Sequence, residues 1–114
     1  MRVAIVGSRS FSDYDEFLRL LGRLDWHDFE EIVSGGASGS DSLAERFADH
    51  WKIPFKKLKP DWKKNGRSAG FQRNATIISS VDMVIAFWDG KSKGTANDID
   101  LSRKFRKDLI LFFV

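Results

Sequence analysis

The stretch Glu31-Ile32-Val33-Ser34-Gly35-Gly36-Ala37-Ser38-Gly39-Ser40-Asp41 decides the fold. Its first four residues include two adjacent β-branched side chains, which are typical of a short buried strand, and the glycines that follow end that strand. Beyond it, apolar residues recur at spacings of three and four, which predicts an amphipathic helix over residues 43–51. The stretch therefore predicts a strand, a glycine-rich turn and a helix, the unit from which parallel sheets are built.

The same alternation of strand and helix runs along the rest of the chain. Further apolar runs predict strands at residues 2–6, 55–58, 83–87 and 109–114. Helical spacing predicts helices at residues 14–24, at 71–78 and from 94 to 105. Because crossovers between parallel strands are right-handed, we expect one three-layer Rossmann-like α/β domain over residues 1–114, with a five-stranded parallel sheet in the order 3-2-1-4-5.

Some local details of these elements can also be predicted. We expect Ser12 or Asp13 to cap the first helix. Residues 59–67 are predicted to form a basic loop, and Phe71, Ala75 and Ile78 to share the buried face of the helix that follows. The fifth strand has no helix after it, so its phenylalanines at 112 and 113 lack a cover, and we expect a homo-oligomer.

Composition excludes several classes of function. The chain has 114 residues, 42% hydrophobic and 31% charged, as in an ordinary folded domain, and no apolar run approaches the roughly 20 residues of a membrane span. The absence of cysteine excludes disulfides, cysteine-ligated zinc and a thiol nucleophile. With two histidines and no signal-peptide pattern at the N-terminus, we expect a cytoplasmic protein with no membrane partner, no metal site and no cofactor.

Charge is distributed unevenly along the sequence. The formal net charge is −5 over residues 1–51 and +8 over residues 52–114. A basic half favours an anionic ligand, from a nucleotide phosphate up to a nucleic acid. A solvated lysine-rich face is the alternative interpretation.

The unusual residues of the chain cluster in three loops, at residues 7–9, 34–41 and 88–95. In parallel sheets of this kind, ligands bind beyond the carboxyl ends of the strands, where the strand order reverses, and these loops follow strands one, two and four. Glycines let the backbone approach a ligand closely, and free amides at a helix start attract anions. The sequence matches neither a Walker A loop nor the G-x-G-x-x-G fingerprint.

Each glycine loop also has a purely structural interpretation. Ser38 or Ser40 would cap the second helix, with Asp41 complementing its dipole. Thr95 and Asp98, three residues apart, would form a pair resembling a capping box. Between these loops, the basic segment 61–74 places Trp62 where it could stack on a base, and Arg73-Asn74 near a helix start.

Taken together, these residues resemble the SLOG superfamily (the SMF/DprA–LOG group), and most closely its short branch of bacterial and phage proteins related to YspA. The resemblance rests on five motifs in the order of the family, and they span nearly the whole chain: Gly7-Ser8-Arg9, Gly35-Gly36-x-x-Gly39-x-Asp41, Asp61-Trp62-Lys63, Ala69-Gly70-x-x-Arg73-Asn74 and Phe87-Trp88-Asp89-Gly90-x-Ser92-x-Gly94-Thr95. It implies a Rossmann-like fold that binds a nucleotide or a nucleotide-derived ligand.

The resemblance extends to the LOG-type phosphoribohydrolases, which cleave the bond between a base and ribose 5′-monophosphate. Arg73-Asn74 falls on their Arg-Lys pair, and residues 94–98 fall on their Gly-Thr-x-x-Glu segment. Asn74 replaces the lysine, Asp98 replaces the glutamate, and no Pro-Gly-Gly precedes the Gly-Thr. The resemblance therefore supports a shared binding site more strongly than a shared catalytic activity.

Three functions are compatible with these observations. The first is binding of a nucleotide-derived small molecule with hydrolysis of its N-glycosidic bond, the second is a non-enzymatic sensor or sequestering module, and the third, less favoured, is single-stranded nucleic-acid binding. The candidate catalytic residues are Arg73 and Asp98. The candidate ligand-binding residues are Gly7, Ser8, Arg9, Ser34, Gly35, Gly36, Ser38, Gly39, Asp41, Trp62, Asn74, Trp88, Gly90, Ser92, Gly94 and Thr95.

Overall fold

Five parallel strands form one sheet in the order β3-β2-β1-β4-β5 in the computed structural model, which describes residues 1–114. The strands are β1 (Arg2–Gly7), β2 (Glu31–Ser34), β3 (Phe55–Lys57), β4 (Met83–Trp88) and β5 (Asp108–Phe113). The helices are α1 (Tyr14–Leu21), α2 (Ser40–His50), α3 (Trp62–Asn65), α4 (Ala69–Ser79) and α5 (Lys93–Lys104), with 3₁₀ turns η1 (Trp26–Asp28) and η2 (Gly66–Ser68). The predicted fold class and strand order are confirmed.

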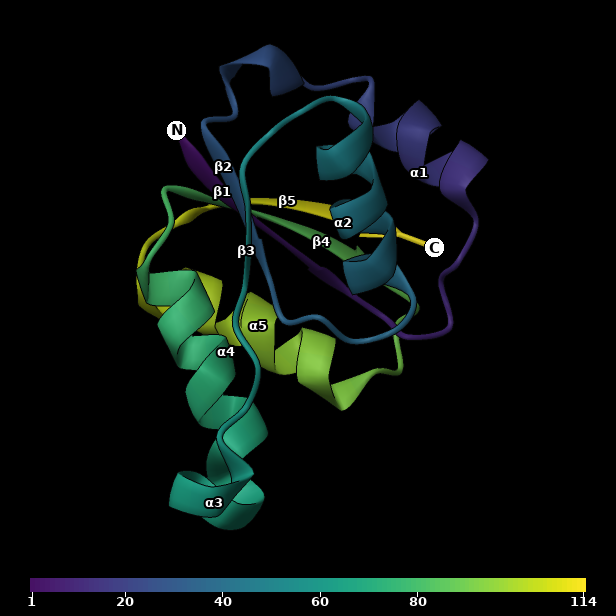
Figure 1. Cartoon of the computed structure of the whole chain (residues 1–114). Helices are drawn as coiled ribbons and strands as arrows, with labels where there is room; N and C mark the ends of the chain where they lie inside the picture. Colours follow the sequence, from purple (N-terminus) through teal and green to yellow (C-terminus); the bar gives the residue numbers. More distant parts are fainter.

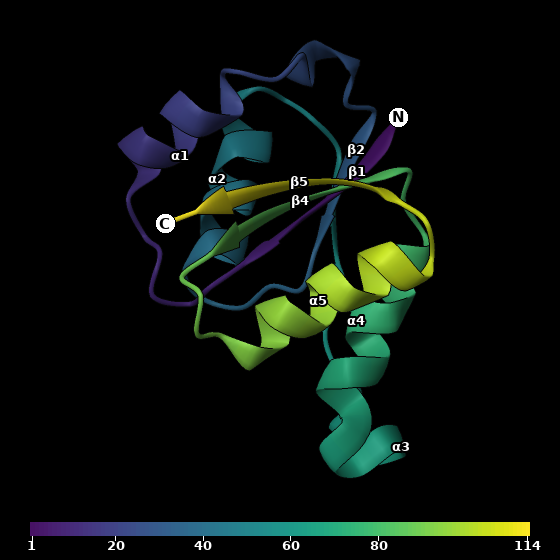
Figure 2. The same cartoon turned by 180° about the vertical axis from the view of Figure 1, so that it is seen from behind.

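Helices cover both faces of the sheet, with α1 and α2 on one face and α4 and α5 on the other (Figures 1 and 2). The central strand β1 is buried on both sides because its side chains alternate between the two layers. Val3 and Ile5 belong to the core under α1 and α2, whereas Ala4 and Val6 belong to the core under α4 and α5. No helix has the length and apolar character needed to span a membrane.

The helix starts only partly follow the predicted capping. The carboxylate of Asp13 accepts a hydrogen bond from the Glu16 amide at 3.1 Å and caps α1 as expected. The prediction that Ser38 or Ser40 caps α2 is wrong, because the N-cap is Gly39, in the left-handed region with φ +71°. A side chain at Gly39 would run into the backbone of Arg9, so the close packing of these two loops takes the place of a side-chain cap.

The start of α5 also differs from the prediction. Its cap is Ser92, whose hydroxyl accepts a hydrogen bond from the Thr95 amide at 3.3 Å. Asp98 lies one turn inside the helix and takes no part in this cap, so the capping-box prediction for Thr95 and Asp98 is wrong. The Asp98 carboxyl must therefore be explained by something other than helix capping.

The segment predicted as a basic loop contains the helical turns α3 and η2. They lie at the amino-terminal end of α4 and project beyond the body of the domain (Figure 1). The carboxylate of Asp61 caps α3 by accepting a hydrogen bond from the Lys64 amide at 3.1 Å. The predicted buried face of α4 is only partly right. Ile78 is buried and Ala75 is half-buried, but Phe71 is 56% exposed, because the buried side of α4 carries Asn74 and Ile77 instead.

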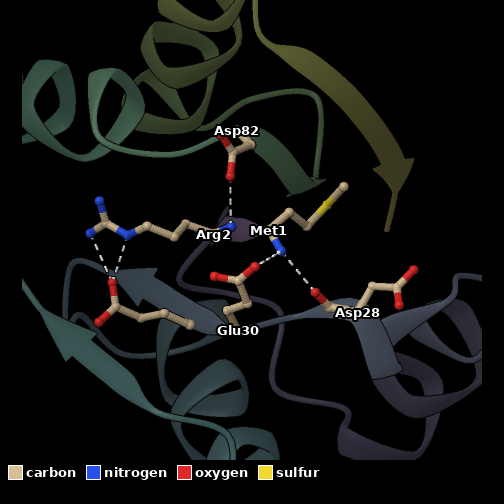
Figure 3. A network of polar contacts seen from close by, with 6 residues as sticks. Met1, Arg2, Asp28, Glu30 and Asp82 are labelled. Atoms are coloured by element: carbon tan, nitrogen blue, oxygen red, sulfur yellow. Dashed lines mark hydrogen bonds and ion pairs between the residues drawn. The ribbon is translucent and has the colours of Figure 1, made fainter.

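Charged contacts hold together the amino-terminal edge of the sheet (Figure 3). The terminal ammonium of Met1 donates to the Glu30 carboxylate and to the Asp28 carbonyl, both at 2.9 Å. The Arg2 amide donates to Asp82 Oδ2 at 2.8 Å, which ties the start of β1 to the turn before β4. The polar groups at this edge are thus used within the fold, in contrast to several at the opposite edge.

Candidate functional site

A cavity of about 450 Å³ opens at the carboxyl ends of β1, β2 and β4. Such a volume lies within the range of small-molecule sites in proteins. The cavity lies at the point where the strand order reverses, between β1 and its neighbours on either side. Its walls are formed by Val6, Gly7, Arg9, Ser10, Gly35, Ala37, Asp41, Arg73, Asn74, Ile77, Asp89, Ser92, Gly94, Thr95 and Asp98.

The cavity brings together many of the candidate residues from four separate segments of the chain. Those that line it are Gly7, Arg9, Gly35, Asp41, Arg73, Asn74, Ser92, Gly94, Thr95 and Asp98. Those that do not line it are Ser8, Ser34, Gly36, Ser38, Gly39, Trp62, Trp88 and Gly90. The glycine loop after β2 therefore contributes fewer residues to the wall than the sequence suggested.

Some of the residues outside the wall shape the loops behind it. The Ser8 hydroxyl accepts a hydrogen bond from the Asp89 amide at 3.0 Å, and the Ser8 carbonyl accepts one from the Ser40 hydroxyl at 3.0 Å. The Trp88 indole donates to the Ser92 carbonyl at 3.1 Å. Trp62 is different, because it lies on α3 with 61% of its surface exposed and does not approach the cavity.

Asp89 belongs to the motif at residues 87–95 and lines the wall, although it was not among the candidate ligand-binding residues. Its Oδ1 accepts hydrogen bonds from the amides of Lys91 and Ser92, both at 2.8 Å, and its Oδ2 accepts one from the Ser10 hydroxyl at 3.1 Å. These bonds, with the backbone amides contributing most, lower the pKa of Asp89 to about 2. The Asp-Gly pair directly after β4 was the available signal, since aspartate often bonds the backbone of a tight turn in this way.

Arg73 is the cation most firmly held in the wall. Its Nη1 donates to the carbonyls of Gly35 at 3.1 Å and Leu58 at 3.3 Å, and its Nε donates to Asn74 Oδ1 at 2.9 Å. It forms no ion pair with any carboxylate of the chain. A Cβ at Gly35 would lie 2.5 Å from Nη1, so the guanidinium can occupy this place only because residue 35 has no side chain.

Two buried carboxyl groups share the cavity with Arg73. Asp98 is 6% exposed, and its Oδ1 has no hydrogen-bond partner in the protein. Burial, reinforced by the charge of nearby Asp41 and opposed by Arg73, raises the pKa of Asp98 to about 8. Asp98 therefore keeps its proton at neutral pH.

Asp41 is buried like Asp98, with 7% of its surface exposed. Burial also raises its pKa, but a hydrogen bond from the Ala37 amide at 3.1 Å and the charges of Arg73 and Arg9 oppose that shift. These contacts oppose the shift only in part, so the pKa values of both buried carboxyl groups are raised, that of Asp98 to about 8. Two carboxyl groups with different surroundings thus face one cavity.

Comparison with known proteins agrees with this architecture. The gene 61 protein of Mycobacterium phage D29 is 32% identical over 104 residues, and the match covers 82% of each chain. Among solved structures, DNA processing protein A from Helicobacter pylori superposes with a TM-score of 0.76 at 24% identity, which shows a shared fold. That match covers 97% of this chain and 64% of the Helicobacter pylori chain, a protein described as having a unique single-stranded DNA binding mode.

A family model matches residues 1–65, which include β1, the glycine loop after β2 and the short helix α3. Its description is the YspA, cpYpsA-related SLOG family. The match leaves Arg73 and Asp98 outside, so the roles of these two residues rest on the geometry of the cavity. Because the model covers more than half of the sequence and the phage relative matches over 82% of its own length, the chain belongs to the YspA, cpYpsA-related SLOG family.

Proposed function

We propose that the cavity binds a nucleotide or a nucleotide-derived ligand through its phosphate. The observation that carries the proposal is Arg73, a part-buried guanidinium fixed by two backbone carbonyls and free of any carboxylate partner. A planar guanidinium held in this way suits a phosphate oxygen, and Arg9 adds a second positive charge to the same wall. Gly94, in the first turn of α5, lines the same wall, and the start of a helix favours an anion.

Titration calorimetry with nucleoside 5′-monophosphates and the matching unphosphorylated nucleosides tests this proposal. We expect the wild type to bind the monophosphates more tightly, and Arg73→Ala to lose about tenfold or more in affinity, as for a charge-assisted phosphate contact. Arg67→Ala is the matched control, because this exposed arginine on η2 lines no part of the cavity. Equal affinity of wild type and Arg73→Ala for the monophosphates would refute the phosphate role.

Hydrolysis of an N-glycosidic bond is the finer form of this proposal, and the Asp41–Asp98 pair favours it. In this reaction the bond from C1′ to the base nitrogen breaks, water adds at C1′, and the base leaves with a proton. A carboxylic acid at Asp98 suits proton donation to the departing base, and Asp41, when ionised, would stabilise the positive charge that develops on the sugar. Without turnover, the same cavity would serve a sensor or a sequestering module.

Chromatography of free base separates the enzyme from the sensor. The wild type is incubated with a panel of ribo- and deoxyribonucleoside monophosphates, alongside Asp98→Asn. An enzyme is expected to release base from at least one of them, and Asp98→Asn to slow that release by two or more powers of ten with little change in affinity. No release from any substrate, with binding intact, would leave the sensor; release that Asp98→Asn does not slow would remove Asp98 from the mechanism.

Single-stranded nucleic-acid binding is the alternative, and the single-stranded DNA binding of the Helicobacter pylori protein supports it. The exposed aromatic rings of Trp62 and Phe71, beside the basic residues of α3, favour it as well. If the basic half serves only a small ligand, affinity for single strands should be weak and collapse with salt. Sub-micromolar binding at physiological salt that is lost in Trp62→Ala would favour this alternative.

A further inference from the structure

Arg73 lies between the main cavity and a second, smaller one. The second cavity, of about 280 Å³, is lined by Leu58, Lys59, Asp61, Lys64, Asn65, Ala69, Gln72, Arg73 and Thr76. Arg73 is the residue that the two walls share. Its Nη1 donates to the carbonyl of Gly35, which lines the first cavity, and to that of Leu58, which lines the second.

Helix α4 explains how one residue can face both cavities. Ala69, Gln72 and Thr76 recur at helical spacing and line the second cavity, whereas Asn74 and Ile77 are turned toward the first. Arg73 stands at the boundary between these two faces. The two cavities are therefore neighbours across a single guanidinium and are not unrelated surface hollows.

The second cavity is positively charged and polar. Lys59 and Lys64 form no ion pair with any carboxylate of the chain. The carboxylate of Asp61 accepts the amide hydrogen of Lys64, so it is engaged in capping α3. The amides of Asn65 and Gln72 add further hydrogen-bonding groups to the wall. These groups suit an anion with several acceptor oxygens.

We propose that the second cavity holds a second phosphate of the ligand whose first phosphate contacts Arg73 from the main cavity. The ligand would then be a dinucleotide, in which phosphate links two nucleoside units, and Arg73 would lie between its phosphates. The volume of the second cavity agrees with its holding only part of the ligand, because about 280 Å³ falls just below the range of sites that enclose a whole small molecule. The inference rests on the proposed function, since it extends the nucleotide of the main cavity.

Calorimetry with a nucleoside 5′-monophosphate and the matching 5′-phosphorylated dinucleotide tests the proposal. We expect the wild type to bind the dinucleotide about tenfold or more tightly than the monophosphate, as for one added charged phosphate contact. The double variant Lys59→Ala/Lys64→Ala should lose that advantage and keep the affinity for the monophosphate. Lys63→Ala/Arg67→Ala is the matched control, because it also removes two positive charges from the same segment and neither residue lines the cavity.

Each outcome decides between the claims. Equal affinity of the wild type for the two probes overturns the second cavity and leaves the nucleotide proposal standing. A loss in Lys63→Ala/Arg67→Ala as large as in Lys59→Ala/Lys64→Ala also overturns it, because the effect would then come from diffuse charge. Binding of neither probe overturns both proposals. A longer single-stranded oligonucleotide is tested in the same way. If it binds more tightly than the dinucleotide, and if Lys59→Ala/Lys64→Ala weakens its binding equally, the dinucleotide unit is part of a nucleic acid.

Discussion

Replacing Asp98 by asparagine should stabilise the protein at neutral pH, and the gain should disappear in acid. Asparagine resembles the protonated carboxyl in size and cannot ionise, so it removes a titration from the buried site. The pKa of this carboxyl rises from 3.8 to about 8 on folding. Folding therefore favours the protonated form, and the native state loses stability as the pH rises between these two values.

The size of the effect follows from the two pKa values. Each unit of pKa shift corresponds to about 1.4 kcal/mol, so ionisation of Asp98 in the unfolded state lowers the stability of the fold by about 4 kcal/mol at pH 7 and by less than about 1 kcal/mol at pH 4. That cost is a large share of the stability of an ordinary domain, about 5–15 kcal/mol. A carboxyl kept at such a cost, without a hydrogen-bond partner for Oδ1, points to a role in binding or catalysis.

Urea unfolding of wild type and Asp98→Asn at a series of pH values between 4 and 8 measures this difference. The gain in unfolding free energy of Asp98→Asn should grow steadily with pH. Asp100→Asn is the control, because it makes the same substitution at an exposed position of the same helix. If the difference in unfolding free energy between Asp98→Asn and wild type stays constant from pH 4 to pH 8, the raised pKa of Asp98 is refuted.

Two further predictions concern the cavity and the sheet edge. Gly35→Ala should displace the Arg73 guanidinium and weaken nucleoside monophosphate binding about tenfold or more by calorimetry, whereas Gly70→Ala, which meets nothing within 4 Å, should leave affinity unchanged. Phe113, 71% exposed on the edge strand β5, should hold a homo-oligomer together, so Phe113→Glu should shift the sedimenting species to a monomer; wild type that already sediments as a monomer would contradict that expectation.

The fold could be predicted from the sequence because each strand and helix carries its own apolar period. The strand order followed from right-handed crossovers, and the same rule placed the loops after β1, β2 and β4 at one edge. The residues that cap the helices were harder to predict from the sequence. Gly39 replaces the expected serine cap at α2 because the packing of its loop against Arg9 requires a glycine, and no spacing along the chain reveals that contact.

The candidate site, like the fold, was predicted from the sequence only in part. Arg73 and Asp98 were singled out from the sequence, and the structure places both in the cavity wall. The protonation of Asp98 and the sharing of Arg73 between two cavities depend on burial and on contacts distant in sequence, such as the Gly35 carbonyl. Asp89 was overlooked because an aspartate after a strand is usually explained by bonds within its own tight turn, and its bond from Ser10 depends on a contact distant in sequence.

Backbone NMR titration of the wild type with a nucleoside 5′-monophosphate tests the central claim most directly. If the nucleotide binds in the main cavity, the largest shift changes should fall on the amides of Gly35, Gly94 and Thr95, from two loops that only the fold brings together. Arg73→Ala should weaken the same set of changes. Saturating changes confined to α3, or none at all, would contradict the assignment of the cavity as the nucleotide site.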